Sequence, residues 1–139
     1  MGIIGRHFNH LEFMSVESNK KFVVDHFEEF VNRKNLDVAD INLAPEYQEH
    51  GSDAPLNLPA GPLGPKEYVA AAFKRFQDIH VTIEDIIGED DKVVVRNTWR
   101  ATDSTNGNPI EFGGIVIWRI AHGQLVERRA YLQAPHPLH

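Results

Sequence analysis

The sequence has no cysteine, which excludes disulfide bonds, thiolate metal ligands and a cysteine nucleophile. It also has no long apolar run, and its longest, "IVIW", is far shorter than the ~20 residues that a membrane-spanning helix needs. Basic residues are the minority, 14 against 20 acidic ones, so the formal net charge of −6 provides no attraction for a phosphate backbone. We therefore expect neither a membrane partner nor a nucleic-acid partner.

The first ten residues, "MGIIGRHFNH", lack the apolar segment of a signal peptide. Gly2 would suit N-myristoylation, but Arg6 stands where that motif has Ser or Thr. We expect a cytoplasmic protein. A length of 139 residues with 42% hydrophobic content suits one globular domain, which we place at residues 1–139 with peripheral tails at 1–14 and 134–139.

The first half of the chain has helical periodicity. Ser15 or Ser18 can cap a helix that runs to about Lys34, because its apolar residues recur at helical spacing. A short second helix is expected to end before Pro45, and a third to begin at Pro65, a favoured first-turn residue. The stretch between them, "HGSDAPLNLPAGPLGP", is expected to be a loop.

From Ile79 onwards the apolar residues alternate with polar ones, which predicts strands. An acidic "GEDD" turn, an Asn-Gly turn and an "AHG" corner separate four such segments. This order predicts an α+β fold in which helices cover one face of an antiparallel sheet. On the third segment one face carries Phe112, Gly114, Val116, Trp118 and Ile120, with Glu111 and Arg119 opposite.

Three stretches carry a family resemblance: "APEYQEH" at 44–50, "FQDIHVTIEDIIGEDDKVVVR" at 76–96 and "GGIVIWRIAHGQLVE" at 113–127. In their order and spacing, residues 18–133 resemble the SnoaL-like polyketide cyclase branch of the nuclear transport factor 2-like superfamily. The resemblance implies a cone-shaped fold of three helices and a curved sheet around an apolar pocket. It also implies acid/base chemistry, without metal or cofactor, on a polyketide- or steroid-like carbonyl compound.

The last strand departs from the pattern of the family. Cyclases of this type commonly have Glu-x-Trp-x-x-x-Asp there, and the aspartate is the acid/base group. Counted from Glu127, this sequence has Arg129 at the aromatic position and Gln133 at the aspartate position. Glutamine cannot exchange a proton at neutral pH. Two functions therefore stay open: a cofactor-independent isomerase, cyclase or lyase, or a small-molecule binding or dimerisation domain without catalysis.

For the enzyme, the candidate site is His50 as general base, with Arg129 and Gln133 stabilising an enolate. The alternatives are that His50 is a loop residue and that Arg129 belongs to a solvated rim. Trp99 and Trp118 are expected on alternating strand faces. The expected pocket lining is aromatic and comprises Tyr47, Trp99, Phe112, Trp118 and Tyr131.

No metal site is expected. The histidine pairs at 7 and 10 and at 136 and 139 lie at the termini, and no carboxylate is placed to complete a site. A homodimer is expected, because the outer face of the sheet still carries Val94, Ile115 and Ile117. The other expected partner is a small apolar ligand.

Overall fold

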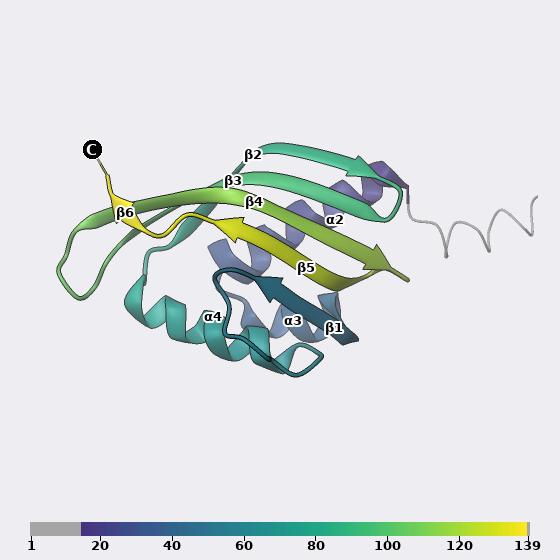
Figure 1. Ribbon diagram of the computed structural model, residues 1–139, viewed down its shortest axis with the longest axis horizontal. Helices are drawn as coiled ribbons and strands as arrows, with labels where there is room; N and C mark the ends of the chain where they lie inside the picture. Colours follow the sequence, from purple (N-terminus) through teal and green to yellow (C-terminus); the bar gives the residue numbers. More distant parts are fainter. Residues whose placement is uncertain (1–14, 139) are drawn as a thin grey trace, which may run out of the picture.

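A capped amphipathic helix begins the described part of the chain, residues 15–138 of a computed structural model (Figure 1). Helix α2 (Val16–Phe27) continues into a π-helical turn, η1 (Glu28–Asn32). The Ser15 hydroxyl accepts a hydrogen bond from the Ser18 N–H at 3.0 Å, as an N-cap does. The predicted first helix is confirmed. Its buried face carries Val23, Phe27, Phe30 and Val31.

The second predicted helix is present as two short pieces, η2 (Leu36–Val38) and α3 (Ala39–Asn42). The chain then enters strand β1 (Leu43–Gly51), which the sequence analysis did not identify as a strand. β1 pairs in parallel with the last long strand, and the pairing is irregular between Leu43 and Gln48, around Pro45. Proline has no N–H to donate, so it fits this edge strand. The sheet is therefore mixed and not antiparallel throughout.

Helix α4 (Leu63–Arg75) follows the loop and begins two residues earlier than expected, with Pro65 in its first turn. A meander completes the chain: β2 (His80–Glu89), β3 (Lys92–Thr102), β4 (Pro109–Ala121) and β5 (Gln124–Leu132). A two-residue strand, β6 (His136–Pro137), pairs with β4. The sheet order is β1-β5-β4-β3-β2.

The chain reverses direction within a tight turn between β4 and β5. His122 and Gly123 have φ values of 52° and 74°, the left-handed conformation that both central residues of a type I′ hairpin turn adopt. Gly107, in the predicted Asn-Gly turn between β3 and β4, has a φ of 74°. The predicted turns therefore lie where the strands reverse.

The sheet has one buried and one solvent-facing side. Figure 1 shows the long strands as arcs on one side of the molecule, with α3 and α4 on the other. The inner face of β4 is the predicted one, with Val116, Trp118 and Ile120 buried. Trp99 on β3 is also buried, so the expectation that the two tryptophans occupy alternating faces is wrong, because both side chains point inward.

A side-chain clasp ties the helical layer to the sheet. The Asn32 amide accepts a hydrogen bond from the Val81 N–H at 2.8 Å and donates one to the Val81 carbonyl at 3.1 Å. The predicted α+β class, with three helical segments against a curved sheet, is confirmed. Among the described residues, no helix has the length and apolar character needed to cross a membrane.

Candidate functional site

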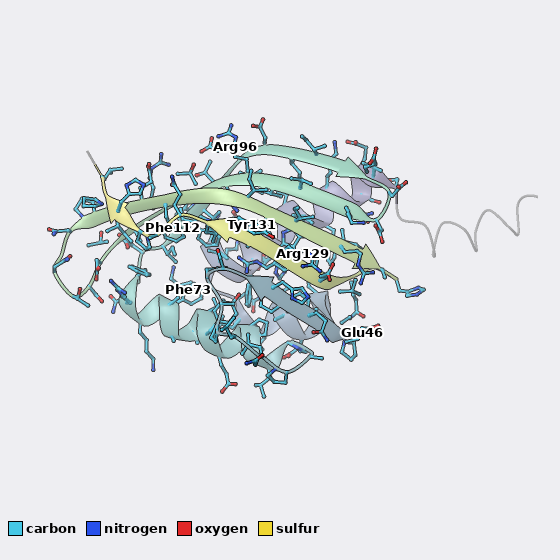
Figure 2. The ribbon with its side chains drawn as sticks, viewed as in Figure 1. Glu46, Phe73, Arg96, Phe112, Arg129 and Tyr131 are labelled. Carbon is cyan, nitrogen blue, oxygen red and sulfur yellow. The ribbon has the colours of Figure 1, made fainter. Side chains whose placement is uncertain are left out.

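A cavity of about 770 Å³ lies between the helices and the inner face of the sheet. Aromatic side chains are prominent in its wall. Trp99 and Phe112 stack with ring centroids 5.6 Å apart and planes 6° from parallel. Figure 2 shows Phe112 on β4 and Phe73 on α4 toward the same end of the molecule. Further aromatic residues line the cavity from both layers: Phe27, Phe30, Tyr47, Tyr68 and Phe76.

An ion cluster of Arg128, Glu49 and Asp53 forms part of the wall. Arg128 on β5 is 6% exposed. Its Nη1 donates to Glu49 Oε2 at 2.7 Å and to Asp53 Oδ1 at 3.0 Å, while Nη2 donates to Asp53 Oδ2 at 3.0 Å. The pairing with Asp53 is thus the bidentate arrangement that suits a guanidinium and a carboxylate. Arg128 joins the end of β1 to the loop that follows it.

The two carboxylates of the ion cluster differ in how many donors they meet. Glu49 Oε1 accepts from the Tyr47 hydroxyl at 2.7 Å and the Tyr68 hydroxyl at 3.2 Å. Its Oε2 accepts from Arg128 and from the Gly51 N–H at 2.9 Å. Four donors use all the in-plane acceptor positions of this carboxylate. Among the described residues, Arg128 is the donor to each Asp53 oxygen, which leaves one acceptor position on each.

Burial sets the protonation of the groups around Glu49. It raises the pKa of Tyr47 well above its usual value, and the neighbouring Glu49 raises it further. Burial raises the pKa of Tyr68 in the same way. Burial lowers the pKa of Arg128, but Tyr68, Glu49 and Asp53 outweigh this effect and raise it well above the ordinary value. Both tyrosines therefore donate as neutral phenols, and the guanidinium stays charged.

Because Gly51 has no side chain, the charged groups of the ion cluster can lie against its backbone. A Cβ at this position would collide with Arg128 Nη1, Asp53 Oδ1 and Glu49 Oε2. All three are the charged ends of the side chains that form the ion cluster. A residue larger than glycine would therefore separate the ions.

His26 contributes a buried imidazole to the cavity wall. Its ring stacks on Phe30 with centroids 5.1 Å apart and meets Trp118 edge-on at 5.5 Å. Its Nδ1 lies 3.0 Å from Asn42 Nδ2 on α3. Burial lowers the pKa of His26 to about 3, and the nearby Arg128 also lowers it. The ring is therefore neutral at physiological pH.

From Glu127 onwards, the odd-numbered residues of β5 lie on the outer face of the sheet. The Arg129 side chain is 49% exposed and donates to Glu127 Oε2 at 3.1 Å. Tyr131 is 67% exposed and does not line the cavity. His50 lies outside the cavity as well, with Nε2 at 3.5 Å from Glu127 Oε2. Arg129 is therefore a solvated rim residue in the structure and does not face the pocket.

Four of the residues expected at a pocket do line the cavity: Tyr47, Trp99, Phe112 and Gln133. Trp118 lies behind the lining, in edge contact with His26 and Phe27. Gln133 is exposed at the cavity edge, where its side-chain oxygen accepts from the Gly113 N–H at 3.1 Å. Ala134 and Pro135, expected in a peripheral tail, also line the cavity. The tail at 1–14, with its two histidines, and His139 lie outside the described residues.

Sequence reasoning missed Arg128, Glu49, Asp53, Tyr68 and His26. The sequence did contain a pattern that places Arg128 on the buried face. The residues at alternate positions around it are Val126, Ala130 and Leu132. Apolar residues at alternate positions mark the buried face of a strand. For His26 the pattern was its position three residues after Val23 and four before Phe30, on one helix face.

Within residues 15–138, no group of three histidine or acidic side chains is arranged to hold a metal ion. The polar groups of the cavity wall include carboxylates, phenols, an imidazole and guanidinium groups.

Solved structures of other proteins share this fold. A candidate polyketide cyclase from Acidithiobacillus ferrooxidans is 22% identical, with a TM-score of 0.76 over 86% of this chain and 92% of its own. IdmH, a candidate polyketide cyclase from Streptomyces antibioticus, is 22% identical, with a TM-score of 0.73 over 83% and 91%. AclR, a candidate hydroxylase from Streptomyces galilaeus, is 18% identical, with a TM-score of 0.74 over 86% and 81%. No curated protein matches the sequence at a significant level.

Residues 21–135 match the family described as SnoaL-like polyketide cyclase. The match covers α2 from residue 21 onwards, the other helices, the cavity and the ion cluster, which is most of the chain. It agrees with the resemblance found from the sequence and with the nuclear transport factor 2-like cone. The chain therefore belongs to the SnoaL-like polyketide cyclase family.

Proposed function

We propose that this protein is a cofactor-independent enzyme that moves a proton on a neutral, apolar carbonyl compound bound in the cavity. Family membership supports a small-molecule enzyme class. The observation that carries the finer proposal is the ion cluster in the wall of a cavity lined largely by apolar and aromatic side chains. Buried charges of this kind need specific partners, and proton-transfer sites use such groups. The reaction class is isomerisation or ring closure through an enolate.

Asp53 is the general base in this proposal. Each of its oxygens has an acceptor position that Arg128 does not use, and its side chain is 31% exposed beside the cavity. Asp53 removes a proton from the carbon next to the carbonyl, and the C–H electron pair passes to the carbonyl oxygen as an enolate. Return of the proton to another carbon gives an isomer. Attack of the enolate carbon on a second carbonyl, whose oxygen takes the proton, closes a ring.

The charge of the ion cluster favours a neutral ligand. Glu49 and Asp53 contribute two negative charges and Arg128 one positive charge, which leaves a net charge of −1. A ligand carboxylate would be repelled, because Arg128 already has two carboxylate partners in a buried site. Arg129, expected from the sequence to stabilise an enolate, has no part in this proposal, because it pairs with Glu127 on the outer face.

Gln133 keeps a supporting role in this proposal. Its side-chain oxygen is bound by the Gly113 N–H, so its NH₂ group is the end available to a ligand at the cavity edge. An amide there can orient a carbonyl or hydroxyl group without exchanging protons.

The alternative is a binding domain without catalysis. Gln133 stands where cyclases of the family carry an acid/base aspartate, and the bidentate pairing with Arg128 restrains Asp53. Such a domain would bind apolar carbonyl compounds but leave their protons in place. The two functions therefore differ in one measurable property.

Proton exchange distinguishes them. We expect the protein to accelerate the exchange of the α-protons of 1-tetralone in D₂O, followed by NMR, because this assay needs only the general base and a ketone that fits the cavity. Asp85→Asn, on an exposed side chain paired with Arg96, should keep the wild-type rate. Exchange no faster than in buffer, together with binding seen as quenching of tryptophan fluorescence, would favour the binding domain.

We also propose a homodimer formed through an outer patch of Val94, Ile115, Ile117 and Tyr131. Ile115 and Tyr131 are paired across β4 and β5, and are 37% and 67% exposed. Arg96 and Glu127 lie on the same face, so two copies related by a two-fold axis can pair opposite charges.

Light scattering at micromolar concentration should therefore give twice the monomer mass for the wild type. Tyr131→Glu should give the monomer mass, because it places a charge in the outer patch without disturbing the core. A wild-type protein that is monomeric under these conditions would contradict the dimer.

A further inference from the structure

One ring nitrogen of His26 is hydrogen-bonded within the described part of the protein, and the other is not. The hydrogen-bonded atom is Nδ1, 3.0 Å from Asn42 Nδ2. An amide nitrogen donates and cannot accept, so Nδ1 is the acceptor in this hydrogen bond. A neutral imidazole has one proton, and that proton is therefore on Nε2.

Among the described residues His26 Nε2 forms no hydrogen bond, and this atom keeps some accessible surface although the residue is only 2% exposed. A polar atom that is accessible from a cavity can pair with water or with a ligand there. A purely structural histidine, which only ties α2 to α3 through Asn42, accounts for Nδ1 alone. Since the ring lines the cavity, a ligand bound there can reach Nε2–H.

The surroundings hold the ring in a fixed orientation. Phe30 stacks on one face and Trp118 meets it edge-on. Arg128 on β5 is the charged neighbour that, after burial, lowers the pKa of His26 to about 3. Glu49 and Asp53 form ion pairs with the Arg128 guanidinium. The imidazole is therefore a preoriented, neutral hydrogen-bond donor at physiological pH.

We propose that His26 binds the carbonyl oxygen of the ligand through its Nε2–H. This inference rests on the proposed function and adds an enolate-stabilising residue that sequence reasoning did not consider. As Asp53 removes the proton, negative charge develops on the carbonyl oxygen, and a donor already in place stabilises it without reorganisation. The chemical class of ligand is then a ketone or another neutral carbonyl compound, in preference to a hydrocarbon of the same shape.

The test uses the wild-type protein labelled with ¹⁵N and two probes of the same skeleton, 1-tetralone and tetralin, which lacks the carbonyl. Imidazole ¹⁵N shifts report the tautomer, and the His26 signals are assigned by their absence from His26→Gln. We expect the proton on Nε2 in the free protein from pH 5 to 8. We expect 1-tetralone, and not tetralin, to shift the Nε2 resonance in a saturable manner.

Affinity gives a second measurement. His26→Leu should weaken 1-tetralone binding roughly threefold to tenfold, the usual contribution of one hydrogen bond, and leave tetralin binding nearly unchanged. His26→Gln keeps a donor and should lose less.

The outcomes separate the two proposals. A proton on Nδ1, or equal shifts with both probes, would overturn the role of His26 even if α-proton exchange is fast. Failure of both probes to bind would contradict the apolar carbonyl ligand itself, and the role of His26 with it.

Discussion

Asp53→Asn is expected to lower the rate of 1-tetralone α-proton exchange by a factor of about 100 or more, the usual contribution of a general base. Asparagine has nearly the same shape and can still accept a hydrogen bond from Arg128 through its oxygen. It cannot take up a proton at neutral pH. The change thus removes the base and keeps the volume of the side chain. NMR in D₂O measures the exchange, and urea unfolding shows whether the variant keeps its stability.

Glu49→Gln is the informative comparison for Asp53→Asn. The Glu49 side chain is 2% exposed and accepts four hydrogen bonds, two of them from the Tyr47 and Tyr68 hydroxyls. An amide replaces one acceptor oxygen with a donor nitrogen, so two of the four donors lose their acceptor. We expect Glu49→Gln to lower stability more than Asp53→Asn does. If Asp53→Asn kept the wild-type rate while Glu49→Gln abolished it at unchanged stability, Glu49 would be the base.

Arg128→Met is expected to lower the free energy of unfolding by about 3–5 kcal/mol, the usual effect of removing one partner from a buried ion pair. Methionine fills a similar volume, so the cost comes from charge and not from a cavity. The variant leaves Glu49 and Asp53 close together in a buried site without the guanidinium that both of them contact. Urea denaturation, compared with the wild type at the same pH, measures the difference.

Arg129→Met is the matched control for Arg128→Met. The two arginines are adjacent in sequence, and the substitution is identical. The Arg129 side chain is 49% exposed and pairs with Glu127 on the outer face. An exposed pair of this kind contributes little, and we expect a change within about 0.5 kcal/mol. We also expect 1-tetralone exchange to be unchanged in Arg129→Met. Equal losses of stability in the two variants would contradict the assignment of Arg128 to the buried face.

The sequence determined the elements whose patterns are local. The helix that begins after Ser15 was evident from a capping serine and apolar residues at helical spacing. The strands after Ile79 were evident from alternation, and their turns from Asn-Gly and His-Gly pairs. Order and spacing of these elements were enough to identify the family. Such patterns depend on neighbouring residues alone, so no tertiary information was needed.

Strand β1 was decided by tertiary structure. Residues 43–51 contain a proline and no clear alternation, and they are extended because β5 pairs with them from about eighty residues further along the chain. The same pairing places Glu49 beside Arg128. The loop after β1 then brings Asp53 to the guanidinium. Contacts between distant segments leave little trace in the sequence of either one.

The choice between Arg128 and Arg129 also needed the tertiary structure. A shift of one residue moves a side chain to the other face of a strand, and "ERRAY" places a charged residue on both faces. The resemblance was counted from Glu127 and drew attention to the odd-numbered face, which is the solvated one. Packing of Ala130 against the core, opposite Val116 on β4, sets the register of this part of β5, and with it the direction of Arg128. The sequence therefore determined the family, and the pairing of β5 with its neighbours decided which arginine enters the cavity.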